Sequence, residues 1–131
     1  MKLLLDVNLL LDIALKREGF QVSKKIIDQC QDSIHHGVIA WHSLSIFHYI
    51  CTKKKGEKPT RQAINSLLEY IEVSPTDTNS AKQATKSQMK DFEDALQAMA
   101  ALKSNCDYIV TKNIKDFKNS PVPAILPVDV N

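Results

Sequence analysis

Residues 3–13, with the sequence LLLDVNLLLDI, place two carboxylates, Asp6 and Asp12, in an otherwise almost wholly apolar run. Burying an unpaired carboxylate is costly, so an acidic residue in such a run needs a partner or a function. Asp6 directly follows three leucines, a pattern typical of a buried parallel strand that ends at a polar residue. Ligands bind at the carboxyl ends of such strands. We therefore interpret Asp6 as a candidate site residue, with Asn8 beside it.

Two later stretches carry further polar side chains at comparable places. DFEDALQAMAA reads as the start of a helix, and YIVTKNIKDF reads as a strong strand followed by a loop. They contribute Asp91, Glu93 and Asp94 from the first, and Thr111, Asn113 and Asp116 from the second. Carboxylates held close together repel one another, so a hard cation such as Mg²⁺ or Mn²⁺ is their natural partner. A divalent ion held in this way activates water and stabilises charge on a phosphodiester.

Each acidic residue also has an ordinary explanation when it is taken alone. Asp94, near a helix start, would cap the helix or favour its dipole. Asp116 would form an Asx-turn in a loop. Asp6 is the hardest to explain in this way, because a carboxylate after three leucines has few structural roles. The joint placement of the three residues favours a metal site.

The elements that would position these groups alternate along the chain. Short apolar runs predict strands at residues 3–5, 38–40, 71–73, 107–110 and 124–126. Helical spacing predicts helices at residues 8–16, 21–36, 43–52, from 59, from 76 or 77 to 89, and 92–103, with Gly37 ending the second of them. This alternation predicts an α/β fold with a central, mainly parallel sheet flanked by helices. We expect a single domain over residues 1–131.

The composition is that of an ordinary globular protein, with 44% hydrophobic and 24% charged residues among 131. The net charge of +2 is too small to require a nucleic-acid partner. Three cysteines without a CxxC pair predict reduced, buried thiols. No apolar run approaches the ~20 residues of a membrane span. Asp6 and Asp12 also interrupt the one segment that looks like a signal peptide, so we expect a cytoplasmic protein without a membrane partner.

The chain resembles the PIN domains of VapC-type toxins, the ribonucleases of bacterial toxin–antitoxin pairs. LLLDVNLLLDI is similar to the first motif of that family, with Asp6-Val7-Asn8 where Asp-Thr-Asn is usual. The C-terminal half, DFEDALQAMAALKSNCDYIVTKNIKDF, is the more specific match, and the tail SPVPAILPVDV also fits. The resemblance covers essentially the whole chain.

The resemblance implies a PIN-like three-layer fold and a metal-dependent endoribonuclease. Its catalytic and metal-binding residues would be Asp6, Asp94 and Asp116, around Mg²⁺ or Mn²⁺. The supporting residues would be Asn8, Asp91, Thr111 and Asn113. It further implies an RNA substrate, a homodimer, and a cognate antitoxin whose C-terminal segment lies across the acidic crevice.

One position departs from the family pattern. PIN nucleases usually carry an acidic residue, or in some families Asn, in the helix after the second strand, where this chain has Ile46. Ile46 cannot ligate a metal. His42, one turn earlier, could substitute in part through water, although a polar residue at a helix start is the simpler interpretation. We therefore expect weak metal binding and a nuclease that Mn²⁺ supports better than Mg²⁺.

Two other functions remain open at this stage. The loss of the second-helix acid is compatible with a degenerate PIN domain that binds RNA or a protein without cleaving it. A phosphohydrolase with Asp6 as nucleophile is disfavoured, because Asn8 is a poor general acid and no glycine-rich phosphate loop exists. Candidate RNA contacts are the basic residues Lys53, Lys54, Lys55, Lys112, Lys115 and Lys118.

Overall fold

A five-stranded, entirely parallel sheet forms the centre of the computed structural model, which describes residues 1–131. The strand order is β3-β2-β1-β4-β5. The strands are β1 (Lys2–Leu5), β2 (His36–Ile39), β3 (Ile71–Val73), β4 (Tyr108–Val110) and β5 (Ala124–Ile125). In the register of the central strands, Leu4 lies opposite Val38 on one side and Ile109 on the other. β1 is therefore the middle strand, buried between two neighbours.

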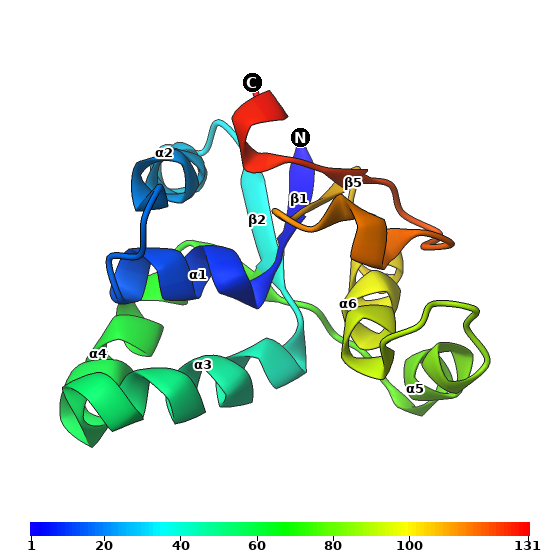
Figure 1. Cartoon of the computed structure of the whole chain (residues 1–131), viewed down its shortest axis with the longest axis horizontal. Coiled ribbons are helices and arrows are strands. Elements are labelled where there is room, and N and C mark those ends of the chain that lie inside the picture. Colours follow the sequence, from blue (N-terminus) through cyan, green and yellow to red (C-terminus); the bar gives the residue numbers. More distant parts are fainter.

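Helices cover both faces of this sheet (Figure 1). The α-helices are α1 (Val7–Ala14), α2 (Phe20–Gln31), α3 (Trp41–Lys55), α4 (Glu57–Leu67), α5 (Thr78–Thr85) and α6 (Phe92–Lys103). Two short 3₁₀ helices follow, η1 (Ile114–Phe117) and η2 (Pro127–Asp129). None of the helices is long and apolar enough to cross a membrane.

The side chains of β1 divide the core into two parts. Leu3 and Leu5 belong to a cluster with residues of α1, α2 and α3, whereas Leu4 belongs to a second cluster with residues of α5 and α6. Successive side chains of a strand point to opposite faces, so three consecutive leucines supply both clusters. The predicted three-layer α/β fold is confirmed.

The predicted strand at residues 71–73 and the predicted helix at residues 92–103 are confirmed. The predicted end of the second helix is wrong, because α2 ends at Gln31 and Gly37 lies inside β2. A Cβ atom at Gly37 would lie 2.5 Å from Ile71 Cδ1 and 2.9 Å from Cys30 Sγ. Glycine at this position allows β2 to pack closely against its neighbours and is not a helix stop.

Other helix boundaries also differ from the sequence prediction. α3 continues through Lys53, Lys54 and Lys55 to Gly56, because cationic side chains are favourable at a helix C-terminus. Pro59 lies at the third position of α4, still in the first turn, where its missing N–H group has no helical partner to lose. α5 ends at Thr85, four residues earlier than expected.

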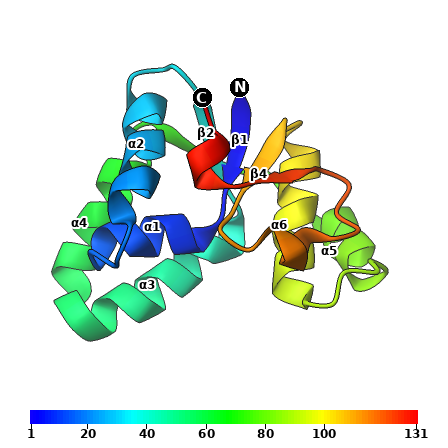
Figure 2. The ribbon, with the colours of Figure 1, turned by 45° about the horizontal axis from the view of Figure 1, so that its top comes forward.

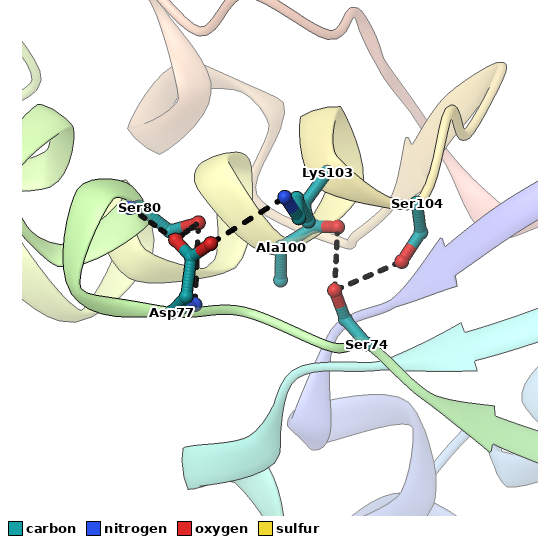
Figure 3. A network of polar contacts seen from close by, with 6 residues as sticks. All are labelled: Ser74, Asp77, Ser80, Ala100, Lys103 and Ser104. Carbon is teal, nitrogen blue, oxygen red and sulfur yellow. Dashed lines mark hydrogen bonds and ion pairs between the residues drawn. The ribbon is translucent and has the colours of Figure 1, made fainter.

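A buried polar network fixes α6, the helix that carries the predicted acidic residues (Figure 3). The Ser74 hydroxyl, just after β3, donates to the carbonyl oxygen of Ala100 at 2.9 Å and accepts from the Ser104 hydroxyl at 2.8 Å. Asp77 caps α5 through a capping box with Ser80 and lies 3.5 Å from Lys103 Nζ. These contacts join the chain after β3 to the C-terminal half of α6.

The carboxyl ends of the strands lie at one edge of the sheet, and three helix N-termini meet there. α1 begins directly after β1, α3 directly after β2, and the first turn of α6 lies beside them (Figures 1 and 2). The loop after β4 reaches the same edge, because β4 is the parallel neighbour of β1. The fold thus brings all three predicted polar segments together.

Candidate active site

Asp6 is almost fully buried, with 4% of its surface exposed, and acts as the N-cap of α1. Its Oδ1 accepts a hydrogen bond from the Asn8 backbone N–H at 3.1 Å and a longer one from Asn8 Nδ2 at 3.4 Å. A side-chain oxygen at this position satisfies a backbone donor that the helix leaves unpaired. Asp6 therefore has a structural role in addition to its position at the strand end.

Thr111 joins the segment after β4 to Asp6. Its buried hydroxyl donates to Asp6 Oδ2 at 2.8 Å and accepts from the Asn113 backbone N–H at 3.1 Å. The Asp6 backbone N–H in turn donates to the carbonyl oxygen of Val110 at 3.1 Å. Two of these hydrogen bonds, from the Thr111 hydroxyl and from the Asp6 backbone N–H, thus hold the first and third motifs in contact across the β1–β4 pair.

The N-terminus of α6 supplies the remaining carboxylates of the site. Asp91 is the N-cap, and its Oδ1 accepts from the Asp94 backbone N–H at 3.0 Å. Glu93 and Asp94 lie in the first turn, where acidic side chains favour the helix dipole. Asp94 is half-buried, whereas Asp91 and Glu93 are exposed. Asp116, from η1, is exposed as well.

These five carboxylates interact electrostatically, and we call them the acidic cluster: Asp6, Asp91, Glu93, Asp94 and Asp116. Burial raises the pKa of Asp94, and the other four carboxylates raise it further, to about 6. Burial, followed by Asp91 and Asp6, also raises the pKa of Glu93. Like charges at close range have this effect, since each disfavours ionisation of the next.

The acidic cluster is not a closed metal cage, because no group of three or more His, Cys, Asp or Glu side chains is arranged to hold an ion. Its donor chemistry nevertheless fits a hydrated divalent ion. Mg²⁺ keeps several waters and is usually bound through one or two carboxylates. A carboxylate offers about four acceptor positions, and Asp6 uses three of them within the protein. Asp6, Asp94 and Asp116 are the residues that could hold such an ion.

A family model described as a PIN domain matches residues 2–115. The chain belongs to the PIN-domain family. PIN domains are nucleases, and toxins of toxin–antitoxin pairs are among them. The match includes Asp6, Asp94 and Thr111 and stops one residue before Asp116. No curated protein sequence matches the chain.

Solved structures share the fold along almost the whole chain. A chain of VapBC2 from Rickettsia felis, bound to a promoter DNA fragment, has a TM-score of 0.73 at 18% identity, covering 96% of this chain and 98% of that one. A chain of VapBC-1 from nontypeable Haemophilus influenzae has a TM-score of 0.72 at 17% identity, covering 98% and 100%. A chain of FitAB bound to an IR36 DNA fragment has a TM-score of 0.72 at 14% identity, covering 98% of this chain and 97% of that one. At these identities the likeness shows the fold.

Helix α3 carries Ile46 at the position where PIN nucleases usually have an acidic residue, and His42 one turn earlier. Ile46 is half-buried and packs against the core cluster that contains Leu3 and Leu5. His42 lines a small cavity of about 90 Å³ with Asp77, Ser80 and Leu96. Burial lowers the pKa of His42, partly opposed by the backbone of Glu93. These surroundings favour a neutral imidazole at the start of α3.

Two sets of predicted RNA-contacting lysines lie at different distances from the acidic cluster. Lys53, Lys54 and Lys55 form the last turn of α3, a helix of 15 residues whose first turn is at the site. At 1.5 Å per residue they are about 20 Å away along the helix axis. Lys112 and Lys115 flank Asn113 and lie beside the site.

Sequence reasoning missed the role of Asp12, the second carboxylate of the opening stretch. Its side chain is 1% exposed, with Lys112 Nζ 2.5 Å from Oδ2 and Arg17 Nη1 3.7 Å from Oδ1. Neither oxygen has a partner with hydrogen-bond geometry, so these are ion pairs only. The pairing with Lys112 joins α1 to the loop after β4. The only signal in the sequence is the carboxylate itself, since its main partner is a hundred residues away.

Proposed function

We propose that the chain is a divalent-metal-dependent endoribonuclease that hydrolyses RNA phosphodiester bonds, acting in the cytoplasm as the toxin of a type II toxin–antitoxin pair. The observation that carries this proposal is the meeting of the five carboxylates of the acidic cluster at the carboxyl edge of a PIN-domain sheet. Such mutual repulsion is relieved by a cation. We assign residues 1–131 to one PIN domain.

In this proposal Asp6, Asp94 and Asp116 are the residues that would hold Mg²⁺ or Mn²⁺, and the ion would supply Lewis-acid activation of water and charge stabilisation on the phosphodiester. Thr111 and Asn8 fix the orientation of the Asp6 carboxylate by hydrogen bonds. Asp91 orients the first turn of α6, and with it Asp94, through its N-cap hydrogen bond. Asn113 is tied to Thr111 through its backbone. Their contribution is a prepared geometry that needs little reorganisation.

The deciding experiment is cleavage of a fluorescent single-stranded RNA by the purified protein with Mg²⁺, with Mn²⁺, or with EDTA. We expect cleavage with either ion, faster with Mn²⁺, and none with EDTA. The Asp94→Asn variant should be folded and inactive, whereas Asp32→Asn, an exposed acid at the opposite edge of the sheet without an ion pair, should retain full activity. Metal-independent cleavage, or full activity of Asp94→Asn, would contradict the proposal.

A second candidate function is a PIN domain that binds RNA or a protein without cleaving it. It is favoured by the packing of Ile46 against the core and by the absence of a closed three-residue metal site. The same assay separates the two functions. An RNA-binding protein of this kind would show no cleavage with either ion. Its wild-type form and its Asp94→Asn variant would bind RNA with equal affinity.

We further propose a cognate antitoxin and a homodimer. Support comes from the solved structures of similar fold, which are VapBC and FitAB complexes. Trp41 and Tyr49 on α3 are 69% and 61% exposed, and we propose that a partner chain covers them. Light scattering of the purified chain tests the dimer, and co-expression with the reading frame next to its own tests the antitoxin. A monomer at micromolar concentration would contradict the dimer.

A further inference from the structure

A polar pocket of about 300 Å³ adjoins the acidic cluster on the side of η1. We call it the lysine pocket, and its lining consists of Gln88, Lys90, Asp91, Lys115, Asp116, Lys118 and Asn119. None of these residues is apolar, whereas pockets for small organic ligands are lined mainly by apolar side chains. The lining therefore favours a charged, hydrated ligand.

The three lysines of the pocket are free to meet an anion. No carboxylate lies within 4.0 Å of the Nζ atom of Lys90, Lys115 or Lys118, in contrast to Lys112, which pairs with Asp12. One of the two acids in the lining, Asp91, already accepts the Asp94 backbone N–H. The N-terminus of α6, the positive end of a twelve-residue helix, lies at the same wall. With three ammonium groups against two carboxylates, the lining carries a net positive charge.

The local fold fixes the backbone segment that carries two of these lysines. Phe117 is buried in the core and anchors η1 against α6 (orange and yellow in Figure 2). Lys115 lies in η1 and Lys118 directly follows it, and both side chains line the pocket. Asn119 adopts a left-handed φ of 71°, which asparagine tolerates. Ser120 then closes the turn with hydrogen bonds to both backbone groups of Val122.

We propose that the lysine pocket binds a phosphate group of the RNA chain other than the one being cleaved. Asp116 belongs both to the acidic cluster and to the pocket lining, so one RNA strand passing the cluster would place a neighbouring phosphate in the pocket. The link to cleavage rests on the proposed function, whereas phosphate binding by the pocket does not. A metal cation bound within the pocket itself is disfavoured because its three ammonium groups outnumber its two carboxylates.

The test measures binding of a fluorescent single-stranded RNA in the Asp94→Asn background, by anisotropy, over a range of salt concentrations. We expect Lys115→Ala/Lys118→Ala to bind several-fold more weakly. The slope of log affinity against log salt should fall by about 0.7 for each phosphate contact removed. Lys90→Ala should lower the slope by a similar amount. The control is Lys25→Ala, an exposed α2 lysine without an ion pair, and the melting temperatures of all variants should match.

Two versions of the RNA, with a 5′-hydroxyl or a 5′-phosphate, identify the source of the phosphate. Equal loss of affinity for both assigns a backbone phosphodiester to the pocket, and loss confined to the phosphorylated RNA assigns a terminal phosphomonoester. An affinity and salt slope equal to those of Lys25→Ala would overturn the proposal, even if the wild-type protein cleaves RNA. Conversely, a lysine-dependent slope in a protein that never cleaves would support the pocket and refute the nuclease.

Discussion

Asp94 shows how the fold sets the charge of a single residue. Its half-buried carboxyl has a pKa of about 6 against an ordinary value of 3.8, because of burial and four neighbouring carboxylates. The folded chain therefore holds this proton more tightly than the unfolded chain. The resulting stability is fully present below about pH 4 and is lost as the pH rises through 6. At neutral pH the metal-free protein folds with this carboxylate charged and repelled.

From this we predict that Asp94→Asn raises the stability of the metal-free protein at pH 7.5 and changes it little at pH 4. A shift of this size corresponds to at most ~3 kcal/mol, which solvent screening of a half-exposed group reduces to about 1–2 kcal/mol. Urea unfolding of both proteins at the two pH values in EDTA measures the difference. A difference in the free energy of unfolding between the two proteins that is equal at both pH values would show that repulsion within the acidic cluster is not its cause.

At the scale of elements, the Asp12–Lys112 ion pair joins α1 to the loop that carries Thr111. Replacing Lys112 with Met would leave a buried carboxylate with only Arg17, at 3.7 Å. We expect the free energy of unfolding to fall by roughly 3 kcal/mol. This is the lower end of the range for breaking a buried ion pair, because Lys112 itself is half-exposed.

The double variant Asp12→Leu/Lys112→Met supplies the control for this prediction. Apolar replacement of both partners of a buried pair is commonly neutral or stabilising, so the double variant should recover most of the loss. Chemical unfolding of the three proteins gives the coupling between the two sites. A Lys112→Met protein as stable as the wild type would mean that Arg17 alone compensates the buried charge.

Gly37 carries a second prediction at this scale. In Gly37→Ala the new methyl group would meet Ile71 Cδ1 at 2.5 Å and Cys30 Sγ at 2.9 Å, which forces the core to shift. Overpacking of this kind costs about 1–3 kcal/mol. Gly19→Ala is the matched comparison, since it meets nothing within 4 Å and has only its φ of 79° to oppose it. Thermal melting should rank Gly37→Ala as the less stable variant if the close approach at β2 is as tight as the distances indicate.

The sequence was sufficient where local signals and tertiary packing agree. Apolar runs located all five strands, and the apolar spacing of residues 92–103 gave α6 its bounds. The sequence was insufficient where the same residue type is compatible with two different structural roles. Gly37 reads as a helix stop but is required by contacts with Ile71 and Cys30, which are distant in sequence or on another element. The lysines after Thr52 read as a break, although they extend α3.

At the scale of the whole molecule, metal binding should couple to folding. Mn²⁺ should raise the melting temperature, with about 2.7 kcal/mol gained at a hundredfold excess over the dissociation constant, and EDTA should reverse it. The gain should be small at pH 5 and larger at pH 7.5, since Asp94 must lose its proton before it can bind an ion. Differential scanning fluorimetry at both pH values measures this. A melting temperature indifferent to metal at pH 7.5, with Asp6 and Asp94 intact, indicates a protein without a metal site.

The topology of the whole molecule explains which parts of the site could be predicted from the sequence. The rule that parallel strands present ligands at their carboxyl ends placed Asp6 and Thr111 at one edge, and their 2.8 Å hydrogen bond agrees with it. The pairing of Asp12 with Lys112 and the gathering of Lys90 with Lys118 depend on segments that meet only in the folded chain. No spacing in the sequence encodes those distances.

Asp6 differs from the other acids of the cluster because α1 also needs it, as the cap of its first turn. Asp94 and Asp116 have no hydrogen bond from their carboxylates to the rest of the chain, so mutation can remove them without an unpaired backbone group. Loss of Asp6 to an apolar residue would cost about 1 kcal/mol, whereas Asn or Ser would still cap. The acids of the cluster should therefore differ in how readily they are replaced during evolution. If the proposed nuclease activity were lost, related chains should lose Asp94 or Asp116 freely while keeping a capping residue at position 6.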